Sequence, residues 1–506
     1  MSLSRRLFLT SSAGALSAPA LLRAQPLQFS RYTVVDYAQR LASQPYDPSV
    51  DHLPTPLANL SYDEYRKIRM RPQARLPLGE GFALDLFHRG HLFPHKVTVH
   101  IVRDGTPHEV PYLSRLFDFG GLRLGQLDRS TGFAGLRLRY PLNRPEIVDE
   151  LGVFLGASYF RFLGRGQRYG TSLRGLGVNA GLPGITEEFP VFREFWIEEA
   201  EPEAQHLVVH ALLDSPSLTG AFRFVFFPAQ ESVVDVQSTL IPRVTLERVA
   251  IAPITSMFFT GAQDRRLPDA FRPEVHDADG LLIEEGQSKR WRPLRNPPEA
   301  QVSTFPISQL TRFGLTQRHR RFDDYQDLEA NYELRPGYVI EPTNAWGPGA
   351  IVLSELSTEF EIHDNIVASF RPDQKLHAGR PWEFHYRIST HTQTQQALAH
   401  VHHALVSPPQ IWLDFAGGDL AYWQHALDDL QLQVQAGDVM LTPLPSSWNP
   451  HVPGVRAGFS LGHATAPGQM IEAFLSARGK RLSETWTCPA PAVPAAQELA
   501  EDRSVR

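Results

Sequence analysis

Apolar and polar residues alternate along much of the chain. The clearest segments are residues 97–102, 135–140, 206–212 and 222–227. A period of two is typical of a β-strand with one face buried and the other exposed. Turn residues such as Arg103-Asp104-Gly105 separate these segments at short intervals. Because no run of strand–helix–strand units is evident, the pattern predicts a large antiparallel β-sandwich rather than a parallel sheet.

The pattern is helical only near the N-terminus. Residues 34–42 and 62–69 are predicted to form short helices. Ser61 precedes the second helix and Glu64 follows three residues later, which is the spacing of a capping box. We therefore expect an all-β protein with small helical additions.

A second series of strands follows a polar, irregular stretch at residues 357–375. Its members are residues 382–389, 410–415, 430–435, 458–461 and 471–476. This region has the length of a small β-sandwich of the immunoglobulin-like kind. We therefore place a domain boundary near residue 365.

Two domains also agree with the length of 506 residues, which is too long for one core. Residues 25–362 are predicted to form the large β-sandwich, and residues 368–488 the immunoglobulin-like domain. Residues 489–506 are rich in alanine, proline and charge, and are predicted to be a disordered tail.

Composition excludes several classes of partner. The formal net charge of -6 provides no basic field, so neither nucleic acid nor an anionic membrane is an expected ligand. The 41 prolines, 36 glycines and 30 phenylalanines fit many short strands and turns. Cys488 is the only cysteine, which excludes an intramolecular disulfide framework and a thiolate zinc site.

The N-terminus carries an export signature. Ser4-Arg5-Arg6-Leu7-Phe8-Leu9 is a twin-arginine pattern, and a small, apolar run follows it. This run is too short for a transmembrane helix, so residues 1–24 are interpreted as a removable signal rather than a membrane anchor. The twin-arginine route carries folded cargo, so the mature protein is expected in the periplasm. No ATP is expected there, which disfavours a kinase or a synthetase.

Three familiar chemistries lack their sequence context. The glycine-rich stretch at residues 164–170 has no amphipathic helix after it, which a phosphate-binding loop requires. His400, His402 and His403 have no carboxylate at metal-ligand spacing. No Gly-x-Ser-x-Gly nucleophile motif is present. We expect no metal and no cofactor, which leaves carboxylate chemistry as the leading enzymatic option.

Acids, arginines and aromatic residues gather in three segments. They are EEFP at 187–190 running into Phe195-Trp196, FRPEVHDADG at 271–280 with WRPL at 291–294, and RHRRFDDYQDLEANYELRP at 318–336 with NAWG at 344–347. Saccharide clefts use this mixture, because charged groups bond sugar hydroxyls while aromatic faces cover apolar CH groups. One such segment would be explained equally well as a salt-bridged loop. Three of them favour a cleft.

The segment at 318–336 is the richest in charge. It holds five carboxylates, three arginines that could orient them and two tyrosines with flat faces for a sugar ring: Asp323, Asp324, Asp327, Glu329, Glu333, Arg320, Arg321, Arg335, Tyr325 and Tyr332. A solvated acidic loop would account for the same charges. Composition alone leaves both interpretations open.

These segments resemble the MdoG family, the osmoregulated periplasmic glucan biosynthesis proteins G and D. The matching motifs are FLGASYF at 154–160 with the loop at 164–170, PITSMF at 253–258, FRPEVHDADGL at 271–281, WRPL at 291–294 and the segment at 318–336. They are in the family's order and extend over nearly the whole mature chain. The twin-arginine signal makes the chain most similar to the D protein.

The resemblance implies a large β-sandwich similar to the galactose-mutarotase superfold, joined to a small immunoglobulin-like domain. It implies a β-1,2-linked glucan as substrate, with inverting hydrolysis or transglycosylation as the reaction. An alternative is a non-catalytic scaffold that presents glucan chains to a membrane glucan synthase. An epimerase would rest on fold analogy alone. A homodimer would let a loop of one subunit complete the cleft of the other.

The resemblance also assigns residues. Asp327 matches the general acid, and Asp235 is the first choice for the base, with Asp277 as the alternative. A lone acid among strand-like valines, as Asp235 is, should have a perturbed pKa or a fixed partner. It could also be a buried acid bonded to the neighbouring backbone. The expected substrate-binding residues are Arg272, Glu274, His276, Asp279, Trp291, Tyr325, Tyr332, Arg335 and Trp346.

In the implied mechanism, protonated Asp327 donates to the departing glycosidic oxygen, directly or through a sugar hydroxyl. The second carboxylate activates water on the other face. Inverting pairs lie about 6.5–9.5 Å apart and retaining pairs about 5–5.5 Å. Hydrolysis and transfer stay open, because loop shapes decide whether water or a sugar hydroxyl reaches the anomeric carbon.

Overall fold

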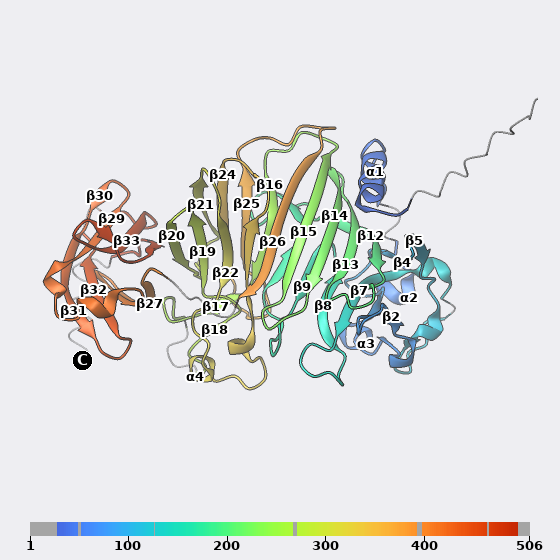
Figure 1. Ribbon diagram of the computed structural model, residues 1–506, viewed down its shortest axis with the longest axis horizontal. Coiled ribbons are helices and arrows are strands. Elements are labelled where there is room, and N and C mark those ends of the chain that lie inside the picture. The colour runs from blue at the N-terminus through green and yellow to red at the C-terminus, as the bar shows by residue number, and fades with distance from the viewer. Residues whose placement is uncertain are drawn as a thin grey trace, which may run out of the picture.

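The computed structural model describes residues 28–48, 52–125, 127–266, 271–391, 397–462 and 465–493. The predicted signal at residues 1–24 and most of the predicted tail lie outside these ranges. Strands dominate the described chain, and the protein is all-β as predicted. The N-terminal helices lie at one end of the molecule and the last strands lie at the other (Figure 1).

Two large sheets form the main body. We call the sheet that begins at β2 the first sheet, and β11 joins it beside β16. In the order of their hydrogen-bonded neighbours its strands are β2 (Leu76–Pro77), β3 (Ala83–His88), β7 (Phe133–Tyr140), β8 (Asp149–Leu155), β9 (Tyr159–Phe162), β10 (Ser172–Arg174), β16 (Val249–Ser256), β25 (Ile366–Pro372), β24 (Gly349–Glu355) and β21 (Gln301–Ile307), with β11 (Leu176–Val178).

The second sheet faces the first and continues into the C-terminal part of the chain. Its strands are, in order, β30 (Val439–Met440), β29 (Leu430–Ala436), β33 (Met470–Ala477), β35 (Thr485–Pro489), β20 (Ser288–Pro293), β19 (Gly280–Glu285), β22 (Arg312–Thr316), β23 (Gly337–Pro342), β26 (Trp382–His391), β15 (Val233–Pro242), β14 (Leu218–Phe227), β13 (Leu207–Asp214), β12 (Val191–Glu198), β4 (Thr98–Arg103) and β5 (Thr106–Glu109), with β34 (Lys480–Arg481) beside β33.

The main core lies between these sheets because each presents alternate apolar residues to the other. Val234 and Val236 of β15 are buried in this core, so Asp235 between them faces away from it. Phe160 and Phe162 of β9 are buried in the same core. The side chains that alternate with them therefore lie on the outer face of the first sheet.

The strands predicted from alternation are confirmed. The segments at 97–102, 135–140, 206–212 and 222–227 correspond to β4, β7, β13 and β14, each within a few residues. Alternation is a local signal that does not depend on which strands pair. For that reason the strands were predictable, whereas their order in the sheets was not.

A third sheet belongs to the C-terminal part of the chain. It consists of β27 (His400–Ser407), β28 (Gln410–Ala416), β32 (Gly454–Ser460) and β31 (Thr442–Asn449) in that order. A second core, with Phe415, Phe459 and Leu475 among its members, lies between the third sheet and the C-terminal strands of the second. This arrangement is a small β-sandwich.

The division between the two parts of the molecule comes later in the chain than predicted. The predicted C-terminal domain begins at residue 368, which lies inside β25. β25 pairs with β16 and β24 of the first sheet, and β26 pairs with β15 and β23 of the second. Both strands therefore belong to the large part. The polar stretch predicts a boundary near residue 365, but strand pairing is long-range and leaves no local signal.

The two parts are joined by more than the covalent chain. β20 of the large part pairs in parallel with β35 of the C-terminal part, with Trp291 opposite Trp486. Both indoles are buried in the second core. The Arg318 guanidinium lies 3.6 Å from the centre of the Trp291 ring and pairs with the buried Glu484 carboxylate at 2.8 Å. We expect the two parts to behave as one stable unit.

The helices are short and peripheral. They are α1 (Arg31–Ala42), α2 (Thr55–Ala58), α3 (Tyr62–Tyr65) and α4 (Phe322–Tyr325). The predicted capping box is present, since the Glu64 amide donates to Ser61 Oγ and the Ser61 amide donates to the Glu64 carboxylate. Two-stranded pairings of β1 (Arg69–Met70) with β6 (Phe117–Asp118) and of β17 (Phe258–Thr260) with β18 (Val275–His276) complete the fold. Within the described ranges, no helix has the length and apolar character needed to cross a membrane.

Candidate active site

The segment at 318–336 forms an anchored loop outside the sheets. α4 ends at Gln326, whose φ of 56° is left-handed and turns the chain directly before Asp327. Tyr325 and Tyr332 are buried on either side of this turn, in a small core with Met257 and Val275. The two tyrosines therefore fix the loop, and Asp327 projects from its anchored base.

Asp327 is held by its own loop and by an arginine from another segment. Oδ1 accepts hydrogen bonds from the amides of Glu329 at 2.9 Å and Ala330 at 2.8 Å. Oδ2 accepts from Arg272 Nη1 at 3.0 Å. The same guanidinium lies 2.8 Å from Glu361 Oε2, so Arg272 is shared between two carboxylates.

The charged state of Asp327 is favoured in this arrangement. Burial would raise its pKa, but the Ala330 amide, the Arg272 guanidinium and the Glu329 amide outweigh burial and lower it. The carboxylate is thus ionised at neutral pH in the absence of a ligand. A proton-donating Asp327 would have to lose part of this stabilisation first.

A second carboxylate–guanidinium pair lies beside the loop. Arg335 Nη1 donates to Asp277 Oδ1, and its Nε and Nη2 donate to the Ala330 carbonyl. Gly170 packs against this pair, because a Cβ at Gly170 would lie 2.7 Å from Arg335 Cδ and 2.9 Å from Asp277 Cγ. The glycine-rich stretch at 164–170 therefore supports the site by close backbone approach.

Sequence reasoning missed a third carboxylate, Asp364. It lies just before β25 with its side chain 38% exposed, and its Oδ2 is 3.9 Å from Arg161 Nη2. Burial raises its pKa, Arg161 opposes that rise and Asp277 adds to it. Asp364 falls in the polar stretch at residues 357–375, where the sequence predicts a domain boundary. The alternation of β9 would have placed Arg161 on the outer face.

A hollow on the first sheet lies beside Arg161, the partner of Asp364. Tyr159 and Arg161 line a hollow of about 390 Å³ on β7, β8 and β9, together with Arg137 and Glu150, which pair at 2.8 Å. The Arg174 guanidinium lies 4.7 Å from the Tyr159 ring centre and pairs with Glu187. A polar, aromatic cleft therefore runs along the outer face of the first sheet.

Each of the three predicted segments contributes charged side chains to the ion pairs described above. Glu187 comes from the first segment, Arg272 and Asp277 from the second, and Asp327 and Arg335 from the third. Charged side chains that lie far apart in sequence thus meet along one surface. The interpretation of these segments as unrelated salt-bridged loops does not fit this convergence.

The first-choice base, Asp235, lies on β15 of the second sheet. It lies on the face of β15 opposite the main core, and both of its oxygens accept from Arg387, at 2.7 and 2.9 Å. Its side chain is 32% exposed, so the expectation of a buried acid bonded to backbone is wrong, while that of a fixed partner is met. Asp235 on β15 thus pairs with Arg387, whereas Asp327 in the loop at 318–336 pairs with Arg272.

Four aromatic residues expected to contact sugar are buried instead. Trp291 belongs to the second core, Trp346 to the main core, and Tyr325 and Tyr332 to the core beneath the loop. The Arg335 guanidinium lies 4.2 Å from the centre of the Tyr332 ring. These rings offer no free face for a sugar. Composition could not distinguish a buried aromatic anchor from an exposed platform.

The remaining predicted ligands form a buried network behind the loop. The Glu274 carboxylate accepts from His276 Nε2 and from His319 Nδ1, each at 2.7 Å. Asp279 Oδ2 accepts from the amides of Arg318, at 2.9 Å, and His319, at 3.4 Å. Glu274, His276 and Asp279 thus position the loop rather than line the cleft. In the part of the chain that the structure describes, no group of three or more His, Cys, Asp or Glu side chains could hold a metal ion.

Comparison with known proteins identifies a family. The family model described as periplasmic glucan biosynthesis protein, MdoG, matches residues 29–489. Glucans biosynthesis protein G of Shewanella frigidimarina (strain NCIMB 400) is 41% identical over 478 residues, which cover 92% of this chain and 85% of the relative.

Two other relatives carry the same name. Glucans biosynthesis protein G of Vibrio cholerae serotype O1 (strain ATCC 39541) is 46% identical over 371 residues, covering 72% of this chain and 68% of the relative. The protein of Rhodopseudomonas palustris (strain BisA53) is 39% identical over 474 residues, covering 91% and 93%. These three relatives are named G, so the expected greater similarity to the D protein stays a prediction.

Proposed function

The chain belongs to the MdoG family of periplasmic glucan biosynthesis proteins, and from this we propose that it acts on β-1,2-glucan, by inverting hydrolysis or by transglycosylation. The observation that carries the proposal is a group of partly exposed carboxylates held by arginines. Asp327 and Glu361 share Arg272, and Asp364 lies beside Arg161. Paired acids and arginines bind sugar hydroxyls, and an acid pair can also move protons.

In this proposal Asp327 is the general acid. Its pKa is low without substrate, so the proton must be acquired on binding. Arg272 provides a means, because it already contacts Glu361. A sugar that moves the guanidinium towards Glu361 would remove a charge that lowers the Asp327 pKa. Asp327 could then protonate the departing glycosidic oxygen.

The second carboxylate would activate water or a sugar hydroxyl on the opposite face of the ring. Asp235, on β15, is held by Arg387, so we consider Asp277 and Asp364 for this role. Asp277 is buried and paired with Arg335, whereas Asp364 is half open to the cleft. Accessibility therefore favours Asp364 as the group that contacts the nucleophile, with Asp277 and Arg335 holding the loop.

We also propose that the protein works in the periplasm. The family description places its members there, and the twin-arginine pattern at Arg5-Arg6 supplies a route. A membrane glucan synthase is the partner that such a location would suggest, and a homodimer would bring a second copy to the cleft. Leu328 and Ile362 are exposed at 85% and 82% beside Asp327 and Glu361, which gives such partners an apolar rim to contact.

One observation favours a second function, that of a non-catalytic scaffold for glucan chains. Asp327 is ionised and fully hydrogen-bonded in the ligand-free protein, which suits a sugar ligand at least as well as an acid. A scaffold needs the arginines and carboxylates of the cleft but no proton donor. The two functions therefore differ in whether glucan is changed.

The experiment is to incubate the purified protein with linear β-1,2-glucan and to measure product masses. Shorter chains that contain the elements of water are expected for hydrolysis, and rings that lack one water for transfer. Unchanged polymer that nevertheless binds would identify the scaffold. If the protein neither binds nor changes the glucan, the proposal is overturned.

A further inference from the structure

The third sheet has an outer face that the candidate active site does not use. On β28, Ile411, Leu413 and Phe415 are buried in the second core. Trp412 and Asp414, which alternate with them, therefore lie on the opposite face. An indole and a carboxylate on one strand, two residues apart, are about 7 Å apart along the strand, so they can contact the same bound chain.

The Trp412 ring lies flat against the neighbouring strand. Trp412 pairs with Gly458 of β32, and a Cβ at Gly458 would lie 2.4 Å from Cε3 and 2.6 Å from Cδ2 of the indole. Only a glycine lets the ring approach the sheet so closely. One face of the indole is thereby covered by backbone, while the residue is only partly buried. A flat, supported ring of this kind suits stacking against the CH face of a sugar.

Next to the indole, Asp414 holds polar groups in fixed orientations. Its carboxylate accepts from Arg456 Nε at 2.8 Å and Nη2 at 2.7 Å, and from Asn449 Nδ2 at 3.1 Å. Asp414 is buried, but the Arg456 side chain is 40% exposed. The guanidinium is thus presented by a buried partner, and such preorganisation lowers the entropic cost of binding.

His403 adds an imidazole that can form hydrogen bonds with sugar hydroxyls. It pairs with Asp414 across β27 and β28, and burial lowers the pKa values of both His403 and His402. A neutral imidazole donates one hydrogen bond and accepts another, as a hydroxyl does. The face therefore combines an aromatic plane, a fixed guanidinium, an amide and neutral imidazoles without a strong charge of either sign.

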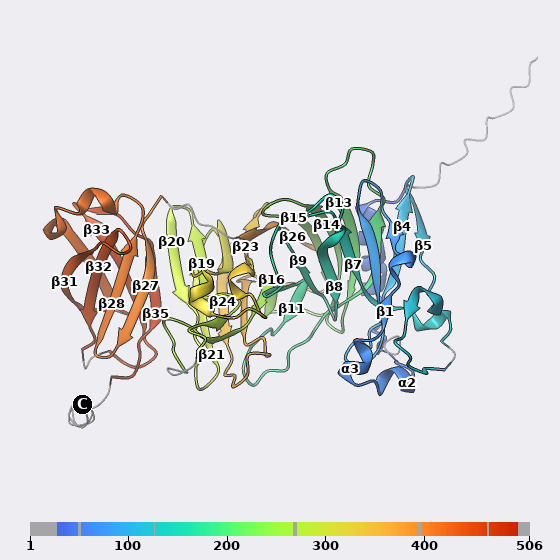
Figure 2. The same cartoon turned by 90° about the horizontal axis from the view of Figure 1, so that it is seen from below.

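This face is hollowed and lies beside the loop that bears Asp327. His403 lines two hollows, of about 450 and 660 Å³, which we together call the groove, and Trp412 lies on β28 outside both. The first contains Asp414, Asn449 and Arg456, and the second extends to Arg265 of the large part. Viewed from below, β27 and β28 lie towards the reader on the same side as the segment around α4 (Figure 2).

A ring contact connects the groove to the loop. The His319 ring centre is 5.8 Å from that of His403 and 6.0 Å from that of His402. His319 belongs to the segment at 318–336, so the groove begins where the anchored base of the active-site loop ends. A chain that occupied the cleft could continue over the third sheet.

We propose that the outer face of the third sheet is a second saccharide-binding site, which holds a distal stretch of the glucan chain. One sugar ring stacks on Trp412, and hydroxyls of the next ring accept from Arg456 and Asn449. The identity of the saccharide as β-1,2-glucan rests on the proposed function, whereas the site itself rests on the geometry of β28 and β32. The site adds affinity only for chains long enough to span both surfaces.

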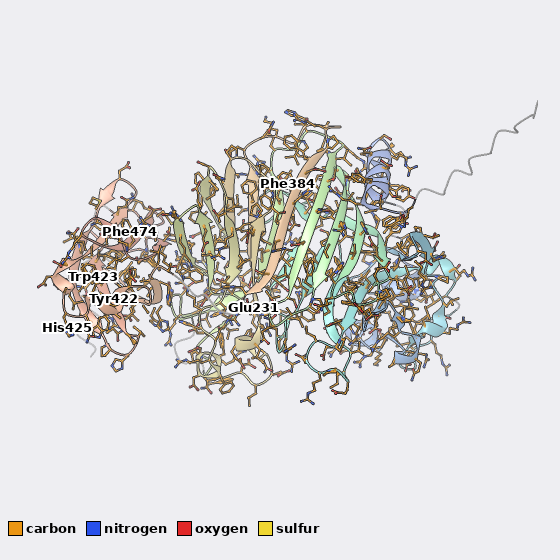
Figure 3. The ribbon with its side chains drawn as sticks, in the orientation of Figure 1. Glu231, Phe384, Tyr422, Trp423, His425 and Phe474 are labelled. Atoms are coloured by element: carbon orange, nitrogen blue, oxygen red, sulfur yellow. The ribbon has the colours of Figure 1, made fainter. Side chains whose placement is uncertain are left out.

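The test measures affinity against chain length. In an Asp327→Asn background, which prevents turnover, linear β-1,2-glucans of about 6 and about 20 glucose units are titrated by calorimetry. Trp412→Ala and, separately, Arg456→Gln are expected to weaken binding of the long chain roughly tenfold and to leave the short chain unchanged. Tyr422→Ala is the matched control, since Tyr422 is 87% exposed in the same part of the molecule but lies in the short helix Leu420–Trp423 rather than on the third sheet (Figure 3).

A spectroscopic measurement shows the contact directly. Protein labelled with 5-fluorotryptophan gives one ¹⁹F signal that is missing in Trp412→Phe, and that signal is expected to shift when the long glucan is added. If the Asp327→Asn parent and its Trp412→Ala and Arg456→Gln variants bind the long chain with equal affinity, and this signal does not shift, the second site alone is overturned. Absence of any glucan binding by the parent protein would overturn the proposed function as well.

Discussion

At the scale of single residues, Arg272 links the chemistry of the cleft to its charge. Its guanidinium contacts Asp327 and Glu361 at the same time. Whichever carboxylate keeps the arginine is stabilised as an anion, and the other is left easier to protonate. Whether Asp327 carries the proton needed for glycosidic cleavage thus depends on the orientation of the Arg272 side chain.

Replacing Arg272 should change the pH dependence as well as the rate. Arg272→Gln removes a charge that lowers the pKa of Asp327, so the pKa should rise. A general acid loses activity as pH rises through its pKa. The alkaline limb of kcat/KM should therefore move to higher pH, even if the maximum falls.

Arg321→Gln is the control for this profile, because Arg321 is exposed and pairs with Asp324 in the same loop. An Arg272→Gln limb that coincides with that of the wild type would contradict the account of Arg272. A limb that moves to lower pH would contradict it too.

Sequence could identify the charged residues of the cleft but not the roles of its aromatic residues. Asp327, Arg272, Asp277 and Arg335 lie in segments whose composition already pointed to a site, and the structure brings them together. Burial decides the role of Trp291, Trp346, Tyr325 and Tyr332, and burial depends on contacts between distant segments. Asp235 is the base that the family resemblance implies, and the structure places it on β15 with Arg387 as its partner.

At the scale of elements, the glycine-rich stretch between β9 and β10 supports the active-site loop. Gly170 packs against the Arg335–Asp277 pair. The stretch thus lets two elements approach each other closely.

Adding a methyl group at Gly170 should displace the loop. Gly170→Ala is expected to destabilise the protein by about 1–3 kcal/mol through overpacking, and to lower activity by displacing the Arg335–Asp277 pair. Thermal unfolding and glucan turnover measure the two effects. Gly166→Asn is the control, because that position has a φ of 73° with nothing near its Cβ, and asparagine tolerates this conformation. Equal effects of the two variants would contradict the packing argument.

At the scale of the whole molecule, the junction between the two parts includes an ion pair that depends on pH. Burial would lower the pKa of His319, but hydrogen bonding to Glu274 and its charge raise it to about 9. Burial would raise the pKa of Glu274, but its hydrogen bonds with His276 and His319 outweigh burial and lower it. The pair is therefore charged at neutral pH, and it lies where the loop meets β27.

This pair predicts how stability depends on pH. A histidine whose pKa is raised from 6.5 to about 9 stabilises the fold fully below pH 6.5 and loses that contribution as pH rises to about 9. His319→Gln should lower the free energy of unfolding by at most about 3 kcal/mol near pH 6, and much less above pH 9. Denaturant titrations across this range measure the difference.

His425→Gln is the control, since His425 is exposed in the C-terminal part (Figure 3). A difference between wild type and His319→Gln that does not change with pH would contradict the charged pair. The junction itself could not be predicted from sequence, because β20 and β35 are almost two hundred residues apart and their pairing leaves no local pattern.

The most direct test of the central claim is the rate at which linear β-1,2-glucan is cleaved or transferred by Asp327→Asn. We expect a loss of about 10²–10⁴-fold relative to wild type, with glucan binding retained, because asparagine keeps the shape of the side chain but cannot donate the proton. Asp323→Asn, an exposed acid of the same loop, should leave the rate unchanged. Turnover by Asp327→Asn at the wild-type rate would contradict the assignment of Asp327 as the general acid.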